Sequence, residues 1–291
     1  ILCDTSEMMA EINAKYAKTL FVSDLDGTLL NEHSMVSPTS ARLLRQAIER
    51  GAHFTIATAR TPATVDALMR EVGCTLPYVV LAGAALWHQQ SQRFTHRMAI
   101  NPDSLGTIMR ICEGKGLRPF IYHASETKIY ATHSAMLSPV EQSFVAERVG
   151  TPYKEFIFGG SDNIAHPAVL MICFDDFSIL CQAADSIRQA LPTHEVMCYR
   201  DLFASEKGFL EVYAPGATKA AAVQRIASQI GATSIVAFGD NVNDIPMLRA
   251  ANTAIAVENA VPQALAIAHE TIGSNRHDSV AKWIFSKTET L

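Results

Sequence analysis

Two carboxylates, separated by one residue, follow a short apolar run near the start of the chain. Residues 19–30 read TLFVSDLDGTLL, so Asp24 and Asp26 come between the apolar residues and a Gly-Thr turn. Such a run suits a buried parallel strand, and open α/β sheets bind ligands at the carboxyl ends of their strands. Burying two acids is costly without a partner, so we expect a cation or a shared proton beside them. The alternative is that the pair only caps a helix or forms part of a turn.

A second apolar run repeats this arrangement much later in the chain. Residues 235–240 read IVAFGD, which places Asp240 at a strand end and Asp244 four residues beyond it. Parallel strands of one sheet end at the same edge, so these acids could converge on Asp24 and Asp26. Several carboxylates in one crevice repel one another unless a hard cation lies among them, and Mg²⁺ prefers such oxygen ligands.

Two further polar residues could bind an anion. Thr58 follows the apolar residues 54–57, and Lys219 opens a predicted helix. A hydroxyl, an ammonium group and the free N–H groups of a helix start suit a phosphate. Taken singly, each residue also has a structural interpretation: Thr58 as an ordinary strand end, Lys219 as a solvated helix residue, Asp244 as a helix cap and Arg60 as half of a structural ion pair.

The elements around these residues alternate between strand and helix. Ser37-Pro38 and Thr61-Pro62 are typical helix starts, and they predict helices over 37–50 and 61–73 between strands at 53–57 and 77–81. This order implies right-handed parallel connections. The same rhythm resumes with a helix at 218–230, strands at 234–238 and 253–257, and helices at 261–269 and 278–285. A short helix is also expected at 6–18.

The middle of the chain has a different organisation. Closely spaced strands are expected at 94–99, 119–123, 128–132, 169–174 and 195–199, with helices near 103–115, 139–148 and 178–190. Short loops between neighbouring strands favour antiparallel pairing. We therefore predict a core formed by 1–85 and 214–291, with an α+β module, residues 86–213, inserted into it.

The composition narrows the class of protein. The chain has 291 residues, 48% of them hydrophobic, and a net charge of −5 without a Lys/Arg run, which argues against a nucleic-acid partner. No apolar run reaches the ~20 residues that span a bilayer, and residues 1–18 do not resemble a secretory signal. Six scattered cysteines without a CxxC pair fit a reducing cytoplasm.

Taken in order, these motifs resemble the haloacid dehalogenase-like superfamily. The motifs are DLDGT at 24–28, Thr58 with Arg60, Lys219, and GDNVND at 239–244. The insert lies between the second and third motifs, as in the Cof-type members, which carry a large α/β cap. The resemblance implies a Rossmann-like three-layer core with sheet order 5-4-1-2-3 and a cap that selects the substrate.

The resemblance also implies a role for each motif. Asp24 would be the nucleophile that takes the phosphoryl group as an aspartyl-phosphate. Asp26 would protonate the leaving oxygen and then activate water; dehalogenases of the superfamily lack this second acid. The implied phosphate-binding residues are Thr58, Lys219, Asn243 and Arg60.

The same resemblance implies a metal site. Asp24, the backbone carbonyl of Asp26 and Asp240 would hold Mg²⁺, and Asp244 would support these ligands from behind. The chain departs from the family pattern at Ala59, often Gly, at Ala82, often Asn, and at Glu258, often Gly. None of these departures removes an implied catalytic group.

The sequence therefore predicts a Mg²⁺-dependent phosphatase of small phosphorylated metabolites, with sugar phosphates favoured and flavin or pyridoxal phosphates as further candidates. Two alternatives stay open. A phosphohexomutase would share the Asp-x-Asp motif, and a binding protein could retain the fold without activity. The oligomeric state does not follow from the sequence.

Overall fold

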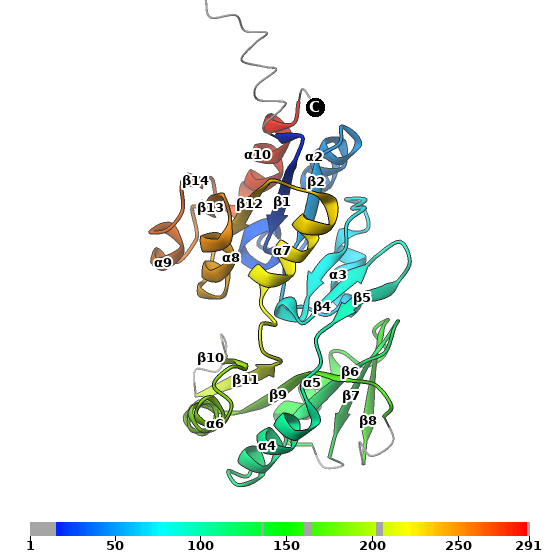
Figure 1. The fold of residues 1–291 in the computed structure, drawn as a ribbon, viewed down its shortest axis with the longest axis vertical. Helices are drawn as coiled ribbons and strands as arrows, with labels where there is room; N and C mark the ends of the chain where they lie inside the picture. Colours follow the sequence, from blue (N-terminus) through cyan, green and yellow to red (C-terminus); the bar gives the residue numbers. More distant parts are fainter. Residues whose placement is uncertain (1–15, 135–136, 160–163, 202–205, 290–291) are drawn as a thin grey trace, which may run out of the picture. The chain divides into compact units, whose positions relative to one another are not determined.

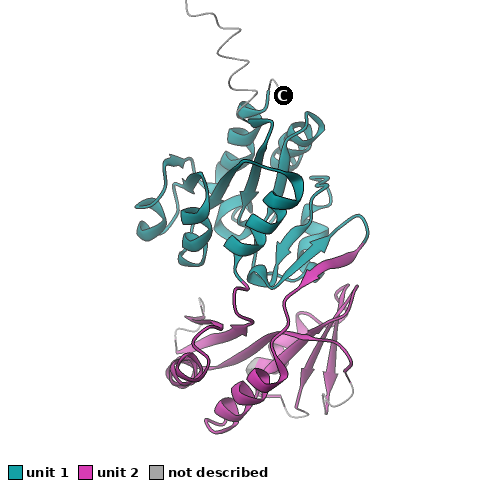
Figure 2. Ribbon diagram, in the orientation of Figure 1, with its two compact units in different colours: residues 1–91, 218–291 teal, residues 92–217 magenta. Residues whose placement is uncertain are grey.

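The computed structural model describes residues 16–134, 137–159, 164–201 and 206–289. The chain divides into two compact units, residues 1–91 with 218–291 and residues 92–217 (Figures 1 and 2). The predicted boundaries after residues 85 and 213 fall close to these divisions. Most of the helix expected at 6–18 lies outside the described residues. Within the described residues, no helix has the length and apolar character needed to cross a bilayer.

The first unit is built on a five-stranded parallel sheet with the order β14-β13-β12-β1-β2. A third strand of the predicted order, β3, joins its edge through a single parallel bridge between Ala57 and Val79. The predicted order 5-4-1-2-3 is thus present, with β14 added beside β13. The strands are β1 (Thr19–Ser23), β2 (His53–Ile56), β3 (Tyr78–Val80), β4 (Ala85–His88), β12 (Ser234–Gly239), β13 (Thr253–Val257) and β14 (Glu270–Ile272).

Helices cover both faces of this sheet. β1 is buried along its whole length, as expected for a strand covered on both sides. In these layers α2 packs against α10, and α7 packs against α8. The helices are α2 (Pro38–Glu49), α3 (Pro62–Met69), α7 (Lys219–Ile230), α8 (Ile245–Ala250), α9 (Pro262–Leu265) and α10 (Ser279–Lys287).

The helix predicted over 261–269 is wrong in its second half. α9 ends at Leu265, and the chain then returns to the sheet as β14. The switch occurs at His269, whose backbone N–H donates to Ala254 O (2.8 Å) while its Nδ1 accepts from the Ala254 N–H (2.9 Å). These tertiary bonds override the helix preference of the Ala-rich residues 264–268.

The second unit, residues 92–217, contains a six-stranded sheet with the order β10-β11-β9-β6-β7-β8. Its neighbouring strands are antiparallel except for β7 and β8. The predicted fold class, a parallel-sheet α/β core with an α+β module, is confirmed, although β4, β8, β11 and β14 were not expected. The elements of this unit are β5 (Arg93–Arg97), α4 (Pro102–Glu113), β6 (Phe120–Ala124), β7 (Ile129–His133), α5 (Pro139–Ala146), β8 (Lys154–Phe158), β9 (Ala168–Asp176), α6 (Phe177–Ala190), β10 (Glu195–Arg200) and β11 (Lys207–Tyr213).

Candidate active site

The adjacent strands β1 and β12 bring two of the predicted acids to one edge of the sheet. Their register pairs Ser23 with Phe238, and the Asp24 N–H donates to Phe238 O (3.0 Å). Asp24 therefore leaves β1 beside the point where β12 leads to Asp240. Asp24 and Asp240 are 5% and 9% exposed as whole residues, so the acids lie at the carboxyl edge and are nearly removed from water.

The turn after Asp24 depends on a glycine. Residues 25–29 form one wide turn, closed by a bond from Leu30 N–H to Leu25 O (2.8 Å). Gly27 has φ +78°, and a Cβ there would lie 2.4 Å from Asp240 Oδ2, so a larger residue is excluded by both conformation and space. The turn also presents Thr28, whose Oγ1 donates to Asp240 Oδ1 (2.8 Å). Sequence reasoning assigned Thr28 no role, although its place directly after Gly27 was a usable signal.

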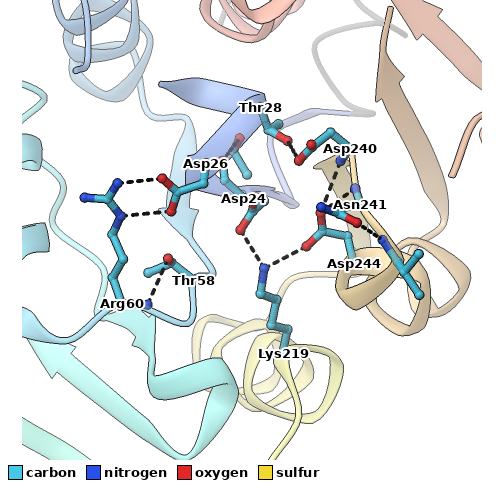
Figure 3. Close-up of polar contacts among 11 residues, drawn as sticks. Asp24, Asp26, Thr28, Thr58, Arg60, Lys219, Asp240, Asn241 and Asp244 are labelled. Carbon is cyan, nitrogen blue, oxygen red and sulfur yellow. Dashed lines mark hydrogen bonds and ion pairs between the residues drawn. The ribbon is translucent and has the colours of Figure 1, made fainter. Parts of the chain in front are cut away.

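Lys219 links the acids of the two strand ends (Figure 3). Its Nζ donates to Asp24 Oδ1 (2.5 Å) and to Asp244 Oδ1 (2.7 Å). Lys219 is 4% exposed, so the interpretation of this residue as a solvated helix residue is wrong. It is the first residue of α7, after the N-cap Thr218. A Cβ on Gly83 would lie 2.2 Å from the Thr218 carbonyl, which shows how closely another turn supports this helix start.

Asp244 has both of its carboxylate oxygens engaged. Oδ1 accepts from Lys219, and Oδ2 accepts from the N–H groups of Asp240 and Asn241, each at 3.1 Å. Asp244 thus closes the 3₁₀ turn after β12 and positions Lys219, but its side chain does not cap the following helix α8. Within the described part of the chain, the second oxygens of Asp24 and Asp240 accept no hydrogen bond, so these two acids retain free ligand atoms.

The acids also perturb one another's ionisation. Burial raises the pKa of Asp24 to about 8, the Lys219 ammonium opposes this shift, and the Asp244 carboxylate adds to it. Burial likewise raises the pKa of Asp240 to about 6, although the hydrogen bond from Thr28 opposes this. One oxygen each from Asp24, Asp240 and Asp244 lies within 4.8 Å of the others. A hard divalent cation fits this set, because it would supply the positive charge that one lysine does not.

Asp26 faces away from this cluster and toward Arg60. The guanidinium binds the carboxylate through two bonds, Nε to Oδ2 (2.8 Å) and Nη2 to Oδ1 (2.5 Å), as Figure 3 shows. The Asp26 side chain is 53% exposed, so water reaches it. Arg60 is therefore half of an ion pair, as one interpretation held, but its partner is the predicted proton-transfer residue rather than a helix acid.

Thr58 and Asn243 differ in their surroundings. Thr58 is 1% exposed, and its Oγ1 accepts from the Arg60 N–H (3.1 Å), so its hydroxyl hydrogen stays available to another acceptor. Asn243 is exposed in the turn Val242–Asp244. Among the described residues, its side chain makes no hydrogen bond. The structure thus gathers four predicted residues into one cluster, Asp24, Lys219, Asp240 and Asp244, and Figure 3 shows Thr58 and the Asp26–Arg60 pair beside it.

The chain matches known proteins over nearly its whole length. The family model of haloacid dehalogenase-like hydrolases matches residues 21–284. A 5-amino-6-(5-phospho-D-ribitylamino)uracil phosphatase of Bacillus subtilis is 26% identical over 285 residues, covering 90% of this chain and 95% of the relative. A pyridoxal phosphate phosphatase of Escherichia coli is 23% identical over 273 residues, covering 90% and 96%.

The fold is also similar to that of a solved structure. A sugar phosphatase of subclass IIB superposes with a TM-score of 0.70 at 23% identity, covering 91% of this chain and 97% of that one. The chain belongs to the haloacid dehalogenase-like hydrolases, and the family predicted from the motifs is confirmed. The predicted enzyme class agrees with these relatives, which are phosphatases.

Proposed function

We propose that this protein is a Mg²⁺-dependent phosphatase that hydrolyses phosphate monoesters of small metabolites through an aspartyl-phosphate on Asp24. The observation that carries this proposal is the state of the Asp24 carboxylate. One oxygen is held by Lys219 at 2.5 Å, and the other accepts no hydrogen bond from the described residues. A buried carboxylate with one oriented, unoccupied oxygen is suited to nucleophilic attack.

The residues around Asp24 supply charge rather than further chemistry. Lys219 favours the ionised form of Asp24, which is the nucleophilic form. Together with Thr58, it would also offset negative charge on the phosphoryl oxygens as it develops. The side chains of Asp24 and Asp240 and the backbone carbonyl of Asp26 would hold Mg²⁺. When bound, the ion supplies a Lewis acid for the phosphoryl oxygens.

The proton steps fall to Asp26. It would protonate the leaving oxygen and then take a proton from the water that hydrolyses the aspartyl-phosphate. Arg60 occupies both carboxylate oxygens of Asp26 through two bonds, so Asp26 must leave this pair before one of its oxygens can reach the substrate. A phosphate dianion is also a bidentate acceptor for a guanidinium. Substrate binding would therefore free Asp26, and Arg60 would become a phosphate ligand. Asn243, in the turn after β12, is proposed as a further phosphate ligand.

The unit of residues 92–217 is the proposed cap that selects the substrate. The relatives named above act on a phosphorylated ribitylaminouracil, on pyridoxal phosphate and on sugar phosphates. We favour sugar phosphates for this chain and keep the heterocyclic esters as the second class. The described cysteines are free thiols, which fits the cytoplasmic location that the sequence predicts.

The test is phosphate release from a panel of sugar, flavin and pyridoxal phosphates, with Mg²⁺ and with EDTA. Asp24→Asn should abolish turnover. Asp66→Asn is the matched control, because Asp66 is equally buried at 5% exposure and hydrogen-bonds Trp87 rather than the site. Wild-type turnover by Asp24→Asn would disprove the nucleophile, and turnover unaffected by EDTA would disprove the metal. Isomerised sugar phosphate without free phosphate would indicate the mutase, and no turnover of any ester would indicate a binding protein.

A further inference from the structure

The cysteines of the second unit differ in their access to solvent. Cys112 and Cys173 are 0% and 1% exposed, and although their thiols interact, a reagent in water cannot reach them. Cys181 and Cys198 are only partly buried, and their Sγ atoms lie 3.8 Å apart. This unit therefore contains two thiol pairs, of which one is accessible.

Regular secondary structure holds the accessible pair face to face. Cys181 lies in the first half of α6, and Cys198 lies in β10, which packs against that helix. Cys198 is in register with Leu210 of β11, which is fully buried. A second contact fixes the same interface, because Arg188 Nη2 of α6 donates to Val196 O of β10 (3.1 Å). The two sulfurs thus meet at a defined position rather than on flexible loops.

A disulfide between these two cysteines would attach β10 to α6. This strand forms one edge of the six-stranded sheet and, within the described residues, pairs only with β11. An edge strand has hydrogen bonds on one side alone and is the part of a sheet that separates most readily. A covalent bond to α6 would hold β10 from the helix side as well.

We propose that Cys181 and Cys198 form a reversible disulfide when the protein meets hydrogen peroxide. The Cys181 thiolate attacks one peroxide oxygen, which breaks the O–O bond and gives a sulfenic acid and hydroxide. The hydroxide takes up the proton that the Cys181 thiol had released and becomes water. Cys198 Sγ then attacks Cys181 Sγ, so the S–S bond forms, the S–O bond breaks and a second water leaves. Two thiols are oxidised by two electrons, and the peroxide is reduced to two water molecules. A dithiol reverses the reaction by exchange.

The surroundings of the two thiols support this order of events. Burial raises the pKa of Cys198 to about 12, and its interaction with Cys181 raises it further. Cys198 therefore keeps its proton, which leaves the attack on the peroxide to Cys181. The sulfur separation must fall from 3.8 Å to the roughly 2.05 Å of a disulfide. In a reducing cytoplasm such a bond is transient.

The first test is peptide mapping of the full chain after titration with hydrogen peroxide. We expect a peptide linked through Cys181 and Cys198, the loss of two free thiols per chain, and recovery of both with dithiothreitol. In C198S, dimedone should label Cys181 as a trapped sulfenic acid, and C181S should show neither the link nor the label. The buried Cys112 and Cys173 are the internal control and should stay reduced while the protein is folded.

A second measurement tests whether the disulfide stabilises β10. Hydrogen exchange of residues 195–200 should slow severalfold in oxidised wild type and should not change when C181S is treated in the same way. Oxidation confined to other cysteines, links only between chains, or irreversible over-oxidation of Cys181 without a 181–198 link would overturn the proposal. It does not depend on the proposed phosphatase activity, because neither cysteine belongs to the site of the first unit.

Discussion

Replacing Lys219 with Met tests whether this lysine holds the buried acids together. The Lys219 ammonium lies 2.5 Å from Asp24 and 2.7 Å from Asp244, and the three side chains are 4%, 7% and 0% exposed. Met fills most of the same volume but leaves two buried carboxylates without their cation. Removing one partner of a buried ion pair costs roughly 3–5 kcal/mol. We expect a loss of that size in the free energy of unfolding when the protein is free of divalent metal.

The assay is urea unfolding with EDTA and with saturating Mg²⁺. Mg²⁺ supplies positive charge near the same acids, so it should stabilise Lys219→Met more than wild type. Lys18→Met is the matched control, because Lys18 is exposed in the same unit. Its stability should change by no more than about 0.5 kcal/mol, as at other surface positions.

A double mutant separates the ion pair from simple loss of packing. Asp244→Asn keeps the shape of the side chain and removes one of the two charges. If the charges are coupled, Lys219→Met/Asp244→Asn should lose at least about 1 kcal/mol less stability than the sum of the two single changes. Additive losses, or a Lys219→Met protein as stable as wild type in EDTA, would refute the reasoning. Turnover of Lys219→Met should fall by about 10²-fold or more, the typical effect of removing one such stabilising donor.

Three further outcomes follow from local features. Apparent Mg²⁺ affinity, measured by calorimetry, should rise with pH from about 6 to about 8, because burial raises the pKa values of Asp240 and Asp24 to these values and the metal must displace their protons; affinity that falls over this range would contradict the assignment. Ala82 has φ +53°, a conformation that costs a non-glycine residue about 1 kcal/mol, so Ala82→Gly should raise the free energy of unfolding by about 0.5–1 kcal/mol, and a destabilised variant would show that the turn is not strained. In the second unit, burial opposes protonation of His133, but its hydrogen bonds to Glu141 and to two backbone carbonyls raise its pKa above 6.5. Burial likewise opposes ionisation of Glu141, but the same pair and the Ser138 N–H lower its pKa below 4.5. The stabilisation of the folded state by His133 is complete below pH 6.5 and is lost as pH rises through the folded pKa of His133. The stabilisation by Glu141 is complete above pH 4.5 and is lost as pH falls through the folded pKa of Glu141. The pair should therefore stabilise the fold most between pH 4.5 and 6.5. Glu141→Gln should flatten this dependence of the urea midpoint, and an unchanged profile would exclude the pair as its cause.

The sequence predicted the central strands of the first unit but missed β4 and β14 there, just as it missed β8 and β11 in the second unit. Residues 20–22 and 235–238 are apolar runs followed closely by acids, a signal that is present in the local sequence. β8 and β11 were not expected, because residues 154–158 and 207–213 mix charged and aromatic residues. These segments become strands by pairing with β7 and with β9 and β10, which are contacts that a local pattern does not contain.

The types and order of the site residues are properties of the sequence alone. Asp24, Asp26, Lys219 and Asp240 have chemistry that suits a phosphate and a hard cation, and parallel strands must end at a common edge. Which oxygen meets which donor was decided only by the tertiary structure. The pairing of Asp26 with Arg60, the bond from Thr28 and the two engaged oxygens of Asp244 depend on ångström-scale placement of segments up to 212 residues apart. Hydrogen bonds and buried charges are sensitive to distance on that scale, and sequence spacing does not specify it.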